Sequence, residues 1–319
     1  MSKHLSYSLA IAATAVMALS ACGGGASSAA TATTTATTGT GTNYSTAGVL
    51  CSYATSAFNS SASVNATATA TWSCSSTLRS LTANGLPDHA VGTFPNIDNP
   101  NTIAAQNISA SVTVTPTATS VVTPRVGAMD KPGVALNGIA FDPGTAGTCS
   151  DTGTCQQGGQ AVGAWNLEAL GQTFFKWGTD TSNAHVQPNG MYHYHGIPEG
   201  LVTQLSNGNT AMTLIGWAAD GFPIYARYGY TVATDASSAI KVVSSSYRTK
   251  ATPDANRPAS TTTYAMGTFT QDYEYVAGLG DLDECNGRTG VTPEFPKGIY
   301  HYYATDTFPH LQRCVKGKL

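Results

Sequence analysis

One seven-residue segment constrains the fold of this chain more than any other stretch. Residues 190–196 read Gly-Met-Tyr-His-Tyr-His-Gly, so histidines and tyrosines alternate between two glycines. Because residues i and i+2 of a β-strand point to the same face, His193 and His195 are predicted to project together while Tyr192 and Tyr194 cover the other face. Two imidazoles on one face can reach a single ion. The segment therefore predicts a short strand that carries a candidate metal site.

A second segment repeats much of this pattern. Residues 298–303 read Gly-Ile-Tyr-His-Tyr-Tyr, and each segment is followed within a few residues by proline. Either the match is a chance similarity or the two segments are equivalent strands. If they are equivalent and neighbours in a sheet, His301 and Tyr303 would lie beside His193 and His195.

The rest of the chain also favours β-structure. Residues 108–115 alternate between apolar and polar side chains, which predicts a half-buried strand. An Asn-Gly pair at 137–138 stands between two apolar runs, a strong signal for a hairpin. Helical signals are limited to short stretches at 165–170 and 198–205. We expect a mainly β fold, a sandwich-like or irregular antiparallel sheet assembly with a few short helices.

Cysteine usage predicts disulfides that stabilise this fold. Six cysteines follow the N-terminal region, and an even set in an exported chain points to disulfides formed in an oxidising compartment. Proximity along the chain favours the pairs Cys51–Cys74, Cys149–Cys155 and Cys285–Cys314. The alternative is a cysteine-ligated zinc, although no two of these cysteines have the two-residue spacing that is usual at such sites.

The N-terminus is typical of an export signal. Residues 1–21 carry Lys3, an apolar run too short to span a membrane, and small residues at the expected cleavage point. The ending Leu-Ser-Ala-Cys resembles a bacterial lipoprotein processing site, which predicts lipidation of Cys22 and attachment to a lipid membrane. An ordinary secretion signal is the alternative. The expected location is the bacterial cell envelope, facing the periplasm or the exterior.

Composition divides the remaining chain into three parts. Residues 22–45 are almost wholly Gly, Ala, Ser and Thr, which predicts a lipidated flexible tether. Residues 46–84 form a small subregion around Cys51 and Cys74, and residues 85–319 form the main domain. The net charge is −3 and charged residues are 10% of the chain, which argues against nucleic-acid binding because phosphate recognition needs clustered Lys and Arg.

Further polar residues could complete a metal site around the two central histidines. His185 lies just upstream, and His301 or His89 could supply another ligand to a divalent ion such as zinc or copper. Asp88 and Asp220 are candidates for a general base toward metal-bound water. The competing interpretation is structural: histidines that pack between strands, and aspartates that form turns.

Two other features allow more than one interpretation. The oxygen donors around Asp281 and Asp283 faintly resemble a calcium loop, but a structural turn held by Cys285 explains them equally well. An aromatic wall could stack on a sugar or could simply be core. Its main members are Tyr192, Tyr194, Tyr303 and Trp217.

Several blocks taken in order resemble the YHYH domain family, named for the tetrapeptide at 192–195. The blocks are residues 86–92, 137–144, 185–196, 216–226, 282–288 and 300–309. The resemblance covers roughly residues 85–317. It implies an exported bacterial protein, often a lipoprotein, and implies no particular activity.

Three functions are compatible with these observations. The first is an envelope lipoprotein with a histidine-centred metal site, either a metal-dependent hydrolase or another metalloprotein. The second is a non-catalytic module that binds surface glycans through its aromatic side chains. The third is a structural envelope protein in which the histidines serve packing.

Overall fold

The computed structural model describes residues 50–126, 131–158, 160–259 and 263–319, and it confirms a mainly β fold. The predicted signal segment, Cys22 and the tether lie outside the described residues. Within the described ranges, no helix is both long and apolar enough to cross a membrane.

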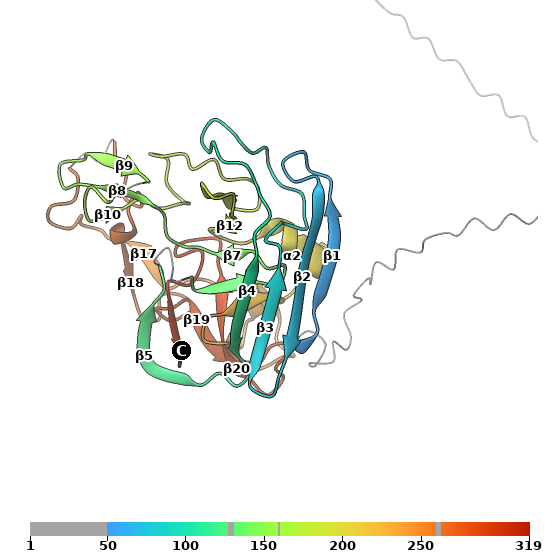
Figure 1. Ribbon diagram of the computed structural model, residues 1–319. Coiled ribbons are helices and arrows are strands. Elements are labelled where there is room, and N and C mark those ends of the chain that lie inside the picture. The colour runs from blue at the N-terminus through green and yellow to red at the C-terminus, as the bar shows by residue number, and fades with distance from the viewer. Residues whose placement is uncertain (1–49, 127–130, 159, 260–262) are drawn as a thin grey trace, which may run out of the picture. The chain divides into compact units, whose positions relative to one another are not determined.

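The first four strands form an antiparallel sheet in chain order. They are β1 (Ala54–Asn59), β2 (Ala66–Cys74), β3 (Leu78–Ala83) and β4 (Ile108–Thr113). Burial alternates along β2, as expected for a sheet with one face on the core and one in solvent. Strand β4 is the one predicted from the alternation at 108–115. Figure 1 shows this sheet in blue to green on the right.

A larger sheet of eight strands carries the central motif. Its order is β11-β12-β7-β6-β13-β14-β20-β19. The bounds are β6 (Gly133–Ala135), β7 (Ala140–Phe141), β11 (Ala184–Val186), β12 (Tyr192–Tyr194), β13 (Thr213–Ala218), β14 (Pro223–Ala226), β19 (Gly287–Gly290) and β20 (Ile299–Ala304). Strands β6 and β7 are the hairpin predicted around the Asn-Gly pair.

The two copies of the motif lie in this sheet but are not neighbours. The first copy is β12 and the second is β20, with β7, β6, β13 and β14 between them. The prediction that His301 and Tyr303 lie beside the first copy is therefore wrong. The copies are nevertheless equivalent, because each strand pairs parallel with the second strand of a hairpin and antiparallel with one further strand.

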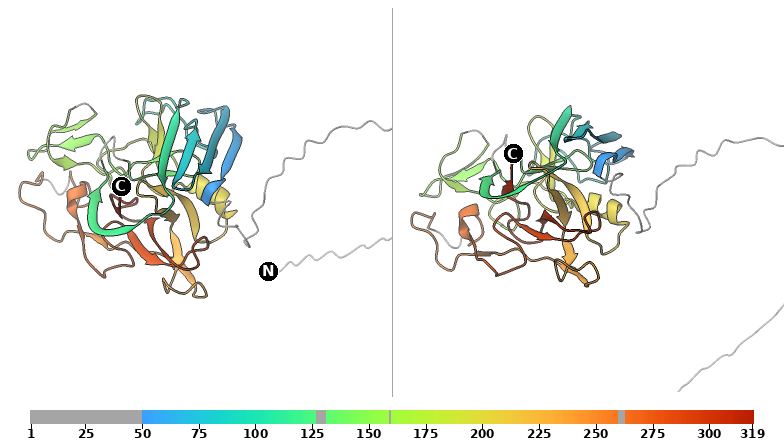
Figure 2. Two further views of the ribbon diagram at one scale, coloured as in Figure 1. Left: turned by 60° about the horizontal axis from the view of Figure 1, so that its bottom comes forward. Right: turned by 90° about the horizontal axis from the view of Figure 1, so that it is seen from below.

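Smaller sheets extend from the eight-stranded sheet. Strands β8–β10 precede β11, strands β15–β18 precede β19, and β5 pairs with the C-terminal strand β21. The bounds are β5 (Ala118–Pro124), β8 (Gly147–Cys149), β9 (Cys155–Gln157), β10 (Trp165–Asn166), β15 (Tyr228–Tyr230), β16 (Ile240–Val242), β17 (Tyr247–Thr249), β18 (Tyr273–Tyr275) and β21 (Cys314–Gly317). Strands β8–β10 lie at the opposite end of the described part from β1–β4 (Figure 1, Figure 2).

Of the two predicted helices, only one forms. Helix α2 (Glu199–Ser206) matches the stretch at 198–205 and ends at Asn207, which takes the left-handed conformation common after helices. The helix expected at 165–170 is instead strand β10, which pairs with β8, followed by an isolated bridge at Leu167 and bends. A six-residue helix has too few internal hydrogen bonds to compete with that pairing. A 3-10 turn, η1 (Thr270–Asp272), precedes β18.

The core lies on both faces of the eight-stranded sheet, and the four-stranded sheet covers part of one face. Trp72 of the small sheet donates its indole N–H to the carbonyl of Leu136 at 2.8 Å, and Arg79 stacks over the ring of Trp217. All four side chains are buried. These contacts place β1–β4 against the middle of the large sheet, where β6 pairs with β13.

Three disulfides form in the predicted pairs: Cys51–Cys74, Cys149–Cys155 and Cys285–Cys314. The first joins the residues before β1 to the end of β2, and the second closes the β8–β9 hairpin. The third ties the loop before β19 to β21. None of these six cysteines is therefore a zinc ligand.

Candidate metal site

Three histidines meet at the end of the eight-stranded sheet. His185 of β11 and His193 of β12 are directly paired across the antiparallel ladder, and His195 follows two residues after His193 on the same face. The loop between the two strands turns at Gly190, whose φ of +85° favours glycine. The alternation predicted for 190–196 is therefore confirmed, and the hairpin adds His185 to the pair.

The reactive nitrogens of these histidines converge. The Nε2 atoms of His193 and His195 are 3.0 Å apart, and those of His195 and His185 are 3.1 Å apart. In the part of the chain that the structure describes, these three residues form the group of potential ligands close enough to share one ion. Ligand nitrogens bound to zinc at about 2.0–2.1 Å in a tetrahedron lie roughly 3.3 Å from one another. The observed spacing is close to that arrangement.

Hydrogen bonds at Nδ1 determine which nitrogen carries the lone pair. His185 Nδ1 lies 2.8 Å from the Trp177 carbonyl and His193 Nδ1 lies 3.3 Å from the Met191 carbonyl. A carbonyl can only accept a hydrogen bond. In both neutral rings, therefore, Nδ1 carries the proton and Nε2 carries the lone pair. His195 can donate from Nε2 to one of these lone pairs but not to both. Without a cation, at least one pair of nitrogens faces each other with no proton between them.

Burial keeps these rings neutral. The exposed fractions of His185, His193 and His195 are 7%, 0% and 2%. Burial lowers the pKa of all three, well below the usual histidine value for His193 and His195, and their mutual repulsion lowers those two further. Neutral imidazole is the form that binds metal ions. His195 Nδ1 has no hydrogen-bond partner within the described residues.

Asp142 is the carboxylate beside the histidines, and it is not among the site residues predicted from the sequence. Its Oδ2 lies 3.9 Å from His193 Nε2 and forms an ion pair with Lys131. Burial raises the pKa of Asp142, opposed by the charge of Lys131. The residue follows the last residue of β7, Phe141. Because β7 runs parallel to β12, the side chain after Phe141 comes beside His195. Only that long-range pairing identifies it.

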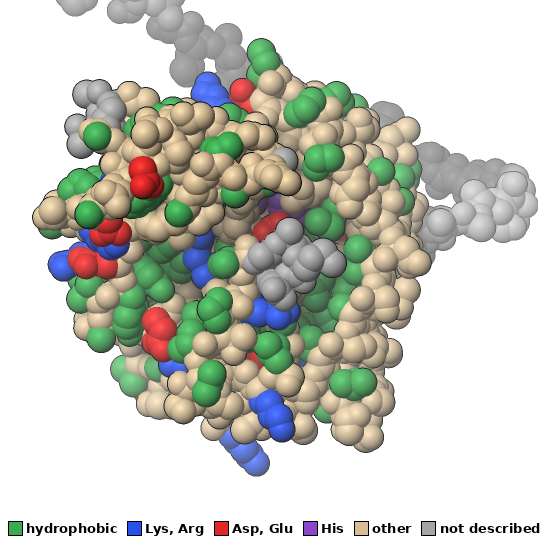
Figure 3. All heavy atoms as spheres, turned by 60° about the vertical axis from the view of Figure 1, so that its left-hand side comes forward, with side chains coloured by type: hydrophobic (Ala, Val, Ile, Leu, Met, Phe, Trp, Pro, Cys, Tyr) green, Lys and Arg blue, Asp and Glu red, His purple; other side chains and the backbone are tan. Residues whose placement is uncertain are grey.

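A cavity of about 330 Å³ lies between the two sheets, and none of the three histidines lines it. A row of directly paired residues runs across the sheet from Trp217 to Val134, Ala140 and His193. The first three line the cavity, together with Ala110 and Val112 of β4 and the side chain of Lys131. His193 is therefore the strand neighbour of a lining residue, Ala140. Figure 3 shows histidine and acidic side chains inside a hollow on one face of the molecule.

His89 and Asp88 lie on the opposite face of β12. Tyr194 donates its hydroxyl proton to His89 Nε2 at 2.6 Å and accepts a hydrogen bond from Asn137 Nδ2, which also donates to Asp88. Tyr194 alternates with the histidines along the strand, so this network faces away from them. The predictions of His89 as a ligand and of Asp88 as a base at the histidines are wrong. Both residues instead hold Tyr194 in place.

His301 and Asp220 belong to the second copy of the motif. His301 contacts the Ile299 carbonyl through Nδ1 and the Tyr303 hydroxyl through Nε2. Asp220 accepts hydrogen bonds from the Tyr302 hydroxyl at 2.6 Å and from the Gly317 N–H. Since four strands lie between β12 and β20, neither residue can act at the three histidines. Both predictions are wrong.

The aromatic side chains form core rather than a binding wall. The exposed fractions of Tyr192, Tyr194, Tyr303 and Trp217 are each 1% or less. A sugar ring needs an exposed aromatic face to stack on. The interpretation of these residues as a glycan-binding wall is wrong.

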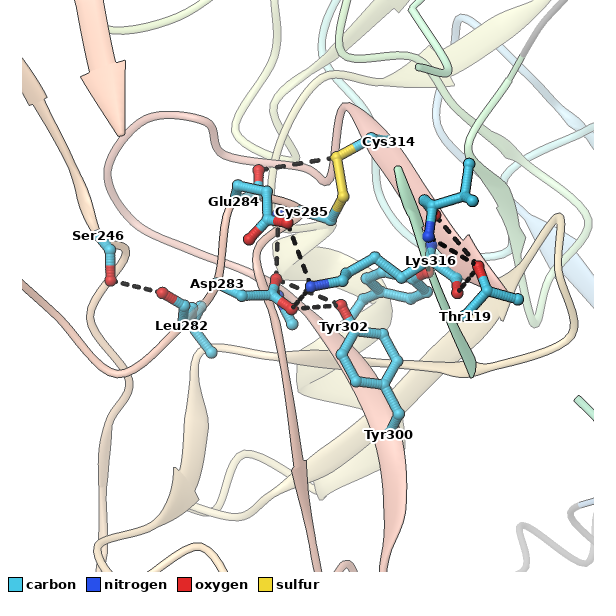
Figure 4. Close-up of polar contacts among 12 residues, drawn as sticks. Thr119, Ser246, Leu282, Asp283, Glu284, Cys285, Tyr300, Tyr302, Cys314 and Lys316 are labelled. Atoms are coloured by element: carbon cyan, nitrogen blue, oxygen red, sulfur yellow. Dashed lines mark hydrogen bonds and ion pairs between the residues drawn. A yellow bond between two sulfur atoms is a disulfide. The ribbon is translucent and has the colours of Figure 1, made fainter. Parts of the chain in front are cut away.

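The Asp281 and Asp283 turn is held by protein donors. Asp281 binds Lys241 Nζ and the Ser244 N–H, while Asp283 accepts from the Tyr300 hydroxyl and pairs with Lys316. Figure 4 shows Asp283, Lys316 and the tyrosine beside the Cys285–Cys314 disulfide. The structure therefore favours the structural turn over a calcium loop.

Comparison with known families agrees with the motifs. A family model described as YHYH protein matches residues 109–317. The chain belongs to the YHYH family. Its β1–β3 precede the matched region, yet β3 pairs with β4 inside that region. No curated protein and no solved structure matches the chain.

Proposed function

We propose that this YHYH protein is a lipid-anchored protein of the bacterial envelope that binds one divalent transition-metal ion through His185, His193 and His195. The observation that carries the proposal is the convergence of three buried Nε2 atoms. In His185 and His193 the Nδ1 atom donates to a carbonyl, so Nε2 carries an unprotonated lone pair. A cation at their centre would satisfy all three nitrogens at once.

The donor set supports zinc or copper. Imidazole nitrogen suits both ions, whereas calcium and magnesium prefer oxygen ligands. Three protein ligands leave a further coordination position open, as at catalytic zinc sites. An ion there could act as a Lewis acid or lower the pKa of bound water.

Asp142 and a cavity lined by its partner Lys131 support a site that accepts a ligand. Asp142 Oδ2 lies 3.9 Å from His193 Nε2, and the ion pair with Lys131 neutralises its charge. The cavity of about 330 Å³ is within the usual size range of small-molecule sites. These features favour Asp142, rather than Asp88 or Asp220, as the general base if the protein is a hydrolase.

The envelope location is supported by the sequence and by the disulfides. The Leu-Ser-Ala-Cys ending at Cys22 is the motive for the lipid anchor. Three disulfides in the folded chain are typical of proteins that mature in an oxidising compartment.

Metal analysis of tag-free protein tests the site directly. The protein is loaded with zinc or copper, dialysed, and analysed for metal per chain. We expect one ion per chain in the wild type and loss of at least nine-tenths of it in His193→Gln and in His195→Gln. His301→Gln is the matched control, since it removes a buried histidine from the equivalent strand, and it should keep the full metal content.

Two outcomes would contradict the proposal. One is a wild type that retains neither zinc nor copper. The other is unchanged metal content in folded His193→Gln, with folding checked by circular dichroism. Loss of thermal stability in the histidine variants without any bound metal would instead favour the structural interpretation.

A further inference from the structure

The eight-stranded sheet consists of two equivalent halves. Reading outward from its centre, β6, β7, β12 and β11 pair in the sequence antiparallel, parallel, antiparallel. Strands β13, β14, β20 and β19 repeat this sequence of pairings. At the centre, Trp217 pairs with Val134 in a register that is symmetric about them. The two halves are thus related by an approximate twofold axis.

Equivalent turns open the two hairpins. Gly138 and Gly221 have φ values of +83° and +87°, and each donates its N–H to an alanine carbonyl at 2.9 Å. The residue before each glycine forms a hydrogen bond with the second tyrosine of the motif. Asn137 donates to Tyr194 at 2.9 Å, and Asp220 accepts from Tyr302 at 2.6 Å.

The outer hairpins repeat the same contacts. Tyr192 donates to Asp180 at 2.7 Å, and Tyr300 donates to Asp283 at 2.9 Å. Three residues after each aspartate comes an asparagine with positive φ, 55° at Asn183 and 60° at Asn286. The backbone carbonyls of these asparagines accept hydrogen bonds from the backbone N–H groups of His195 and Tyr303, at 2.8 and 2.9 Å. Chance similarity of the two short motifs would not produce these matching hydrogen bonds.

The equivalence extends to the metal site. Arg288 pairs with His301 across β19 and β20, just as His185 pairs with His193 across β11 and β12. Arg288 therefore occupies the position of His185. Tyr303, two residues after His301, occupies the position of His195. The Tyr303 hydroxyl lies 3.1 Å from His301 Nε2 and 3.1 Å from Arg288 Nη2. The corresponding distances among the three histidines are 3.0 and 3.1 Å. Two sites of the same geometry therefore hold different donor sets.

The second site supplies its own cation. Arg288 donates to the Tyr303 hydroxyl, which can donate its proton to His301 Nε2, because His301 Nδ1 faces a carbonyl. Each of these three contacts has a donor and an acceptor. Guanidinium stays charged at all ordinary pH values. The first site has the same geometry with three neutral imidazoles and no cation of its own.

We infer that the YHYH domain contains two copies of one site, and that in the second copy the guanidinium of Arg288, at the position of His185, supplies the positive charge that a metal ion supplies in the first. This inference rests on the proposed function of the first copy. The chain then binds one ion rather than two, and the second copy lacks only the two ligands that correspond to His185 and His195.

Restoring those ligands tests the inference. In Arg288→His/Tyr303→His we expect the zinc content to rise from one to two ions per chain. In the same double variant made on a His193→Gln background we expect one ion, bound at the second copy. Arg288→Gln/Tyr303→Phe is the matched control, because it removes the same groups without adding ligands, and it should remain at one ion.

A second measurement covers the case in which the double variant fails to fold. Arg288→His alone leaves Tyr303 in place and creates a site with two histidines and a tyrosine. On the His193→Gln background, added copper should produce a visible tyrosinate-to-copper charge-transfer band, which Tyr303→Phe should abolish.

The outcomes separate this inference from the proposed function. A folded Arg288→His/Tyr303→His variant that stays at one ion, together with no charge-transfer band in Arg288→His, would overturn the inference and leave the first site intact. A wild type without metal and a double variant with one ion would overturn the proposed function and support the equivalence of the two sites. Absence of metal from both proteins would overturn both.

Discussion

At the scale of the residue, His193 and His301 show how one position can serve two purposes. Both are fully buried, and both direct Nδ1 to the carbonyl two residues earlier. They differ in what faces Nε2: two imidazoles in one case, and a tyrosine that Arg288 contacts in the other. The identity of the histidine therefore does not decide its role, because its neighbours across the sheet do.

The protonation of His301 should make the folded state sensitive to acid. Burial lowers the pKa of His301 to about 4, so below pH 6.5 the unfolded chain gains a proton that the folded chain does not. Stability from this group is present above pH 6.5 and is lost as the pH falls toward 4. The full effect is about 3 kcal/mol.

Denaturant unfolding of wild type and His301→Gln at pH 7 and pH 4, both with chelator, measures this effect. The free energy of unfolding should fall less on acidification in the variant, by up to about 3 kcal/mol. Equal losses in the two proteins would show that His301 does not contribute. The three central histidines titrate in both proteins, so their effect cancels in the comparison.

At the scale of the element, the sequence predicted strands better than helices. The alternation at 108–115 and at 190–196 could be read directly, because side-chain direction in a strand depends only on adjacent residues. The prediction of a helix at 165–170 was wrong because β10 pairs with β8. Helix propensity does not take account of such pairing between segments. The repeat of the motif at 298–303 was visible in the sequence, but its position in the sheet was not.

The glycine of each hairpin turn supports the contact between the two sheets. Gly138 has φ +83°, and a Cβ there would overlap Ala83 of β3. Gly138→Ala should therefore destabilise the protein by about 2–5 kcal/mol, from about 1–2 kcal/mol of backbone strain and about 1–3 kcal/mol of overpacking. Denaturant unfolding measures the loss.

Gly208→Ala is the control for this prediction. Gly208 has a similar φ of +72°, and nothing lies within 4 Å of a Cβ there. It should lose only the cost of backbone strain, about 1–2 kcal/mol. Equal losses at the two positions would show that the contact with β3 contributes nothing.

At the scale of the whole molecule, the Cys285–Cys314 disulfide joins two segments that the sheets leave apart. Cys285–Cys314 spans 29 residues and ties the loop before β19 to the C-terminal strand, whereas Cys149–Cys155 spans 6 residues within one hairpin. Loop-closure entropy predicts a loss of about 3–4 kcal/mol for Cys285→Ala/Cys314→Ala and about 2 kcal/mol for Cys149→Ala/Cys155→Ala. Unfolding of the two double variants measures the difference. The reverse order would contradict the entropic explanation.

By itself, the amino-acid sequence determined the β character of the chain and the shared face of His193 and His195, and it favoured the three disulfide pairs. These depend on neighbouring residues or on short separations along the chain. Only the tertiary structure decided that Asp142 lies beside the histidines and that the second copy of the motif is remote from the first. The physical reason is that strand order and register are set by packing between distant segments, which no local pattern encodes.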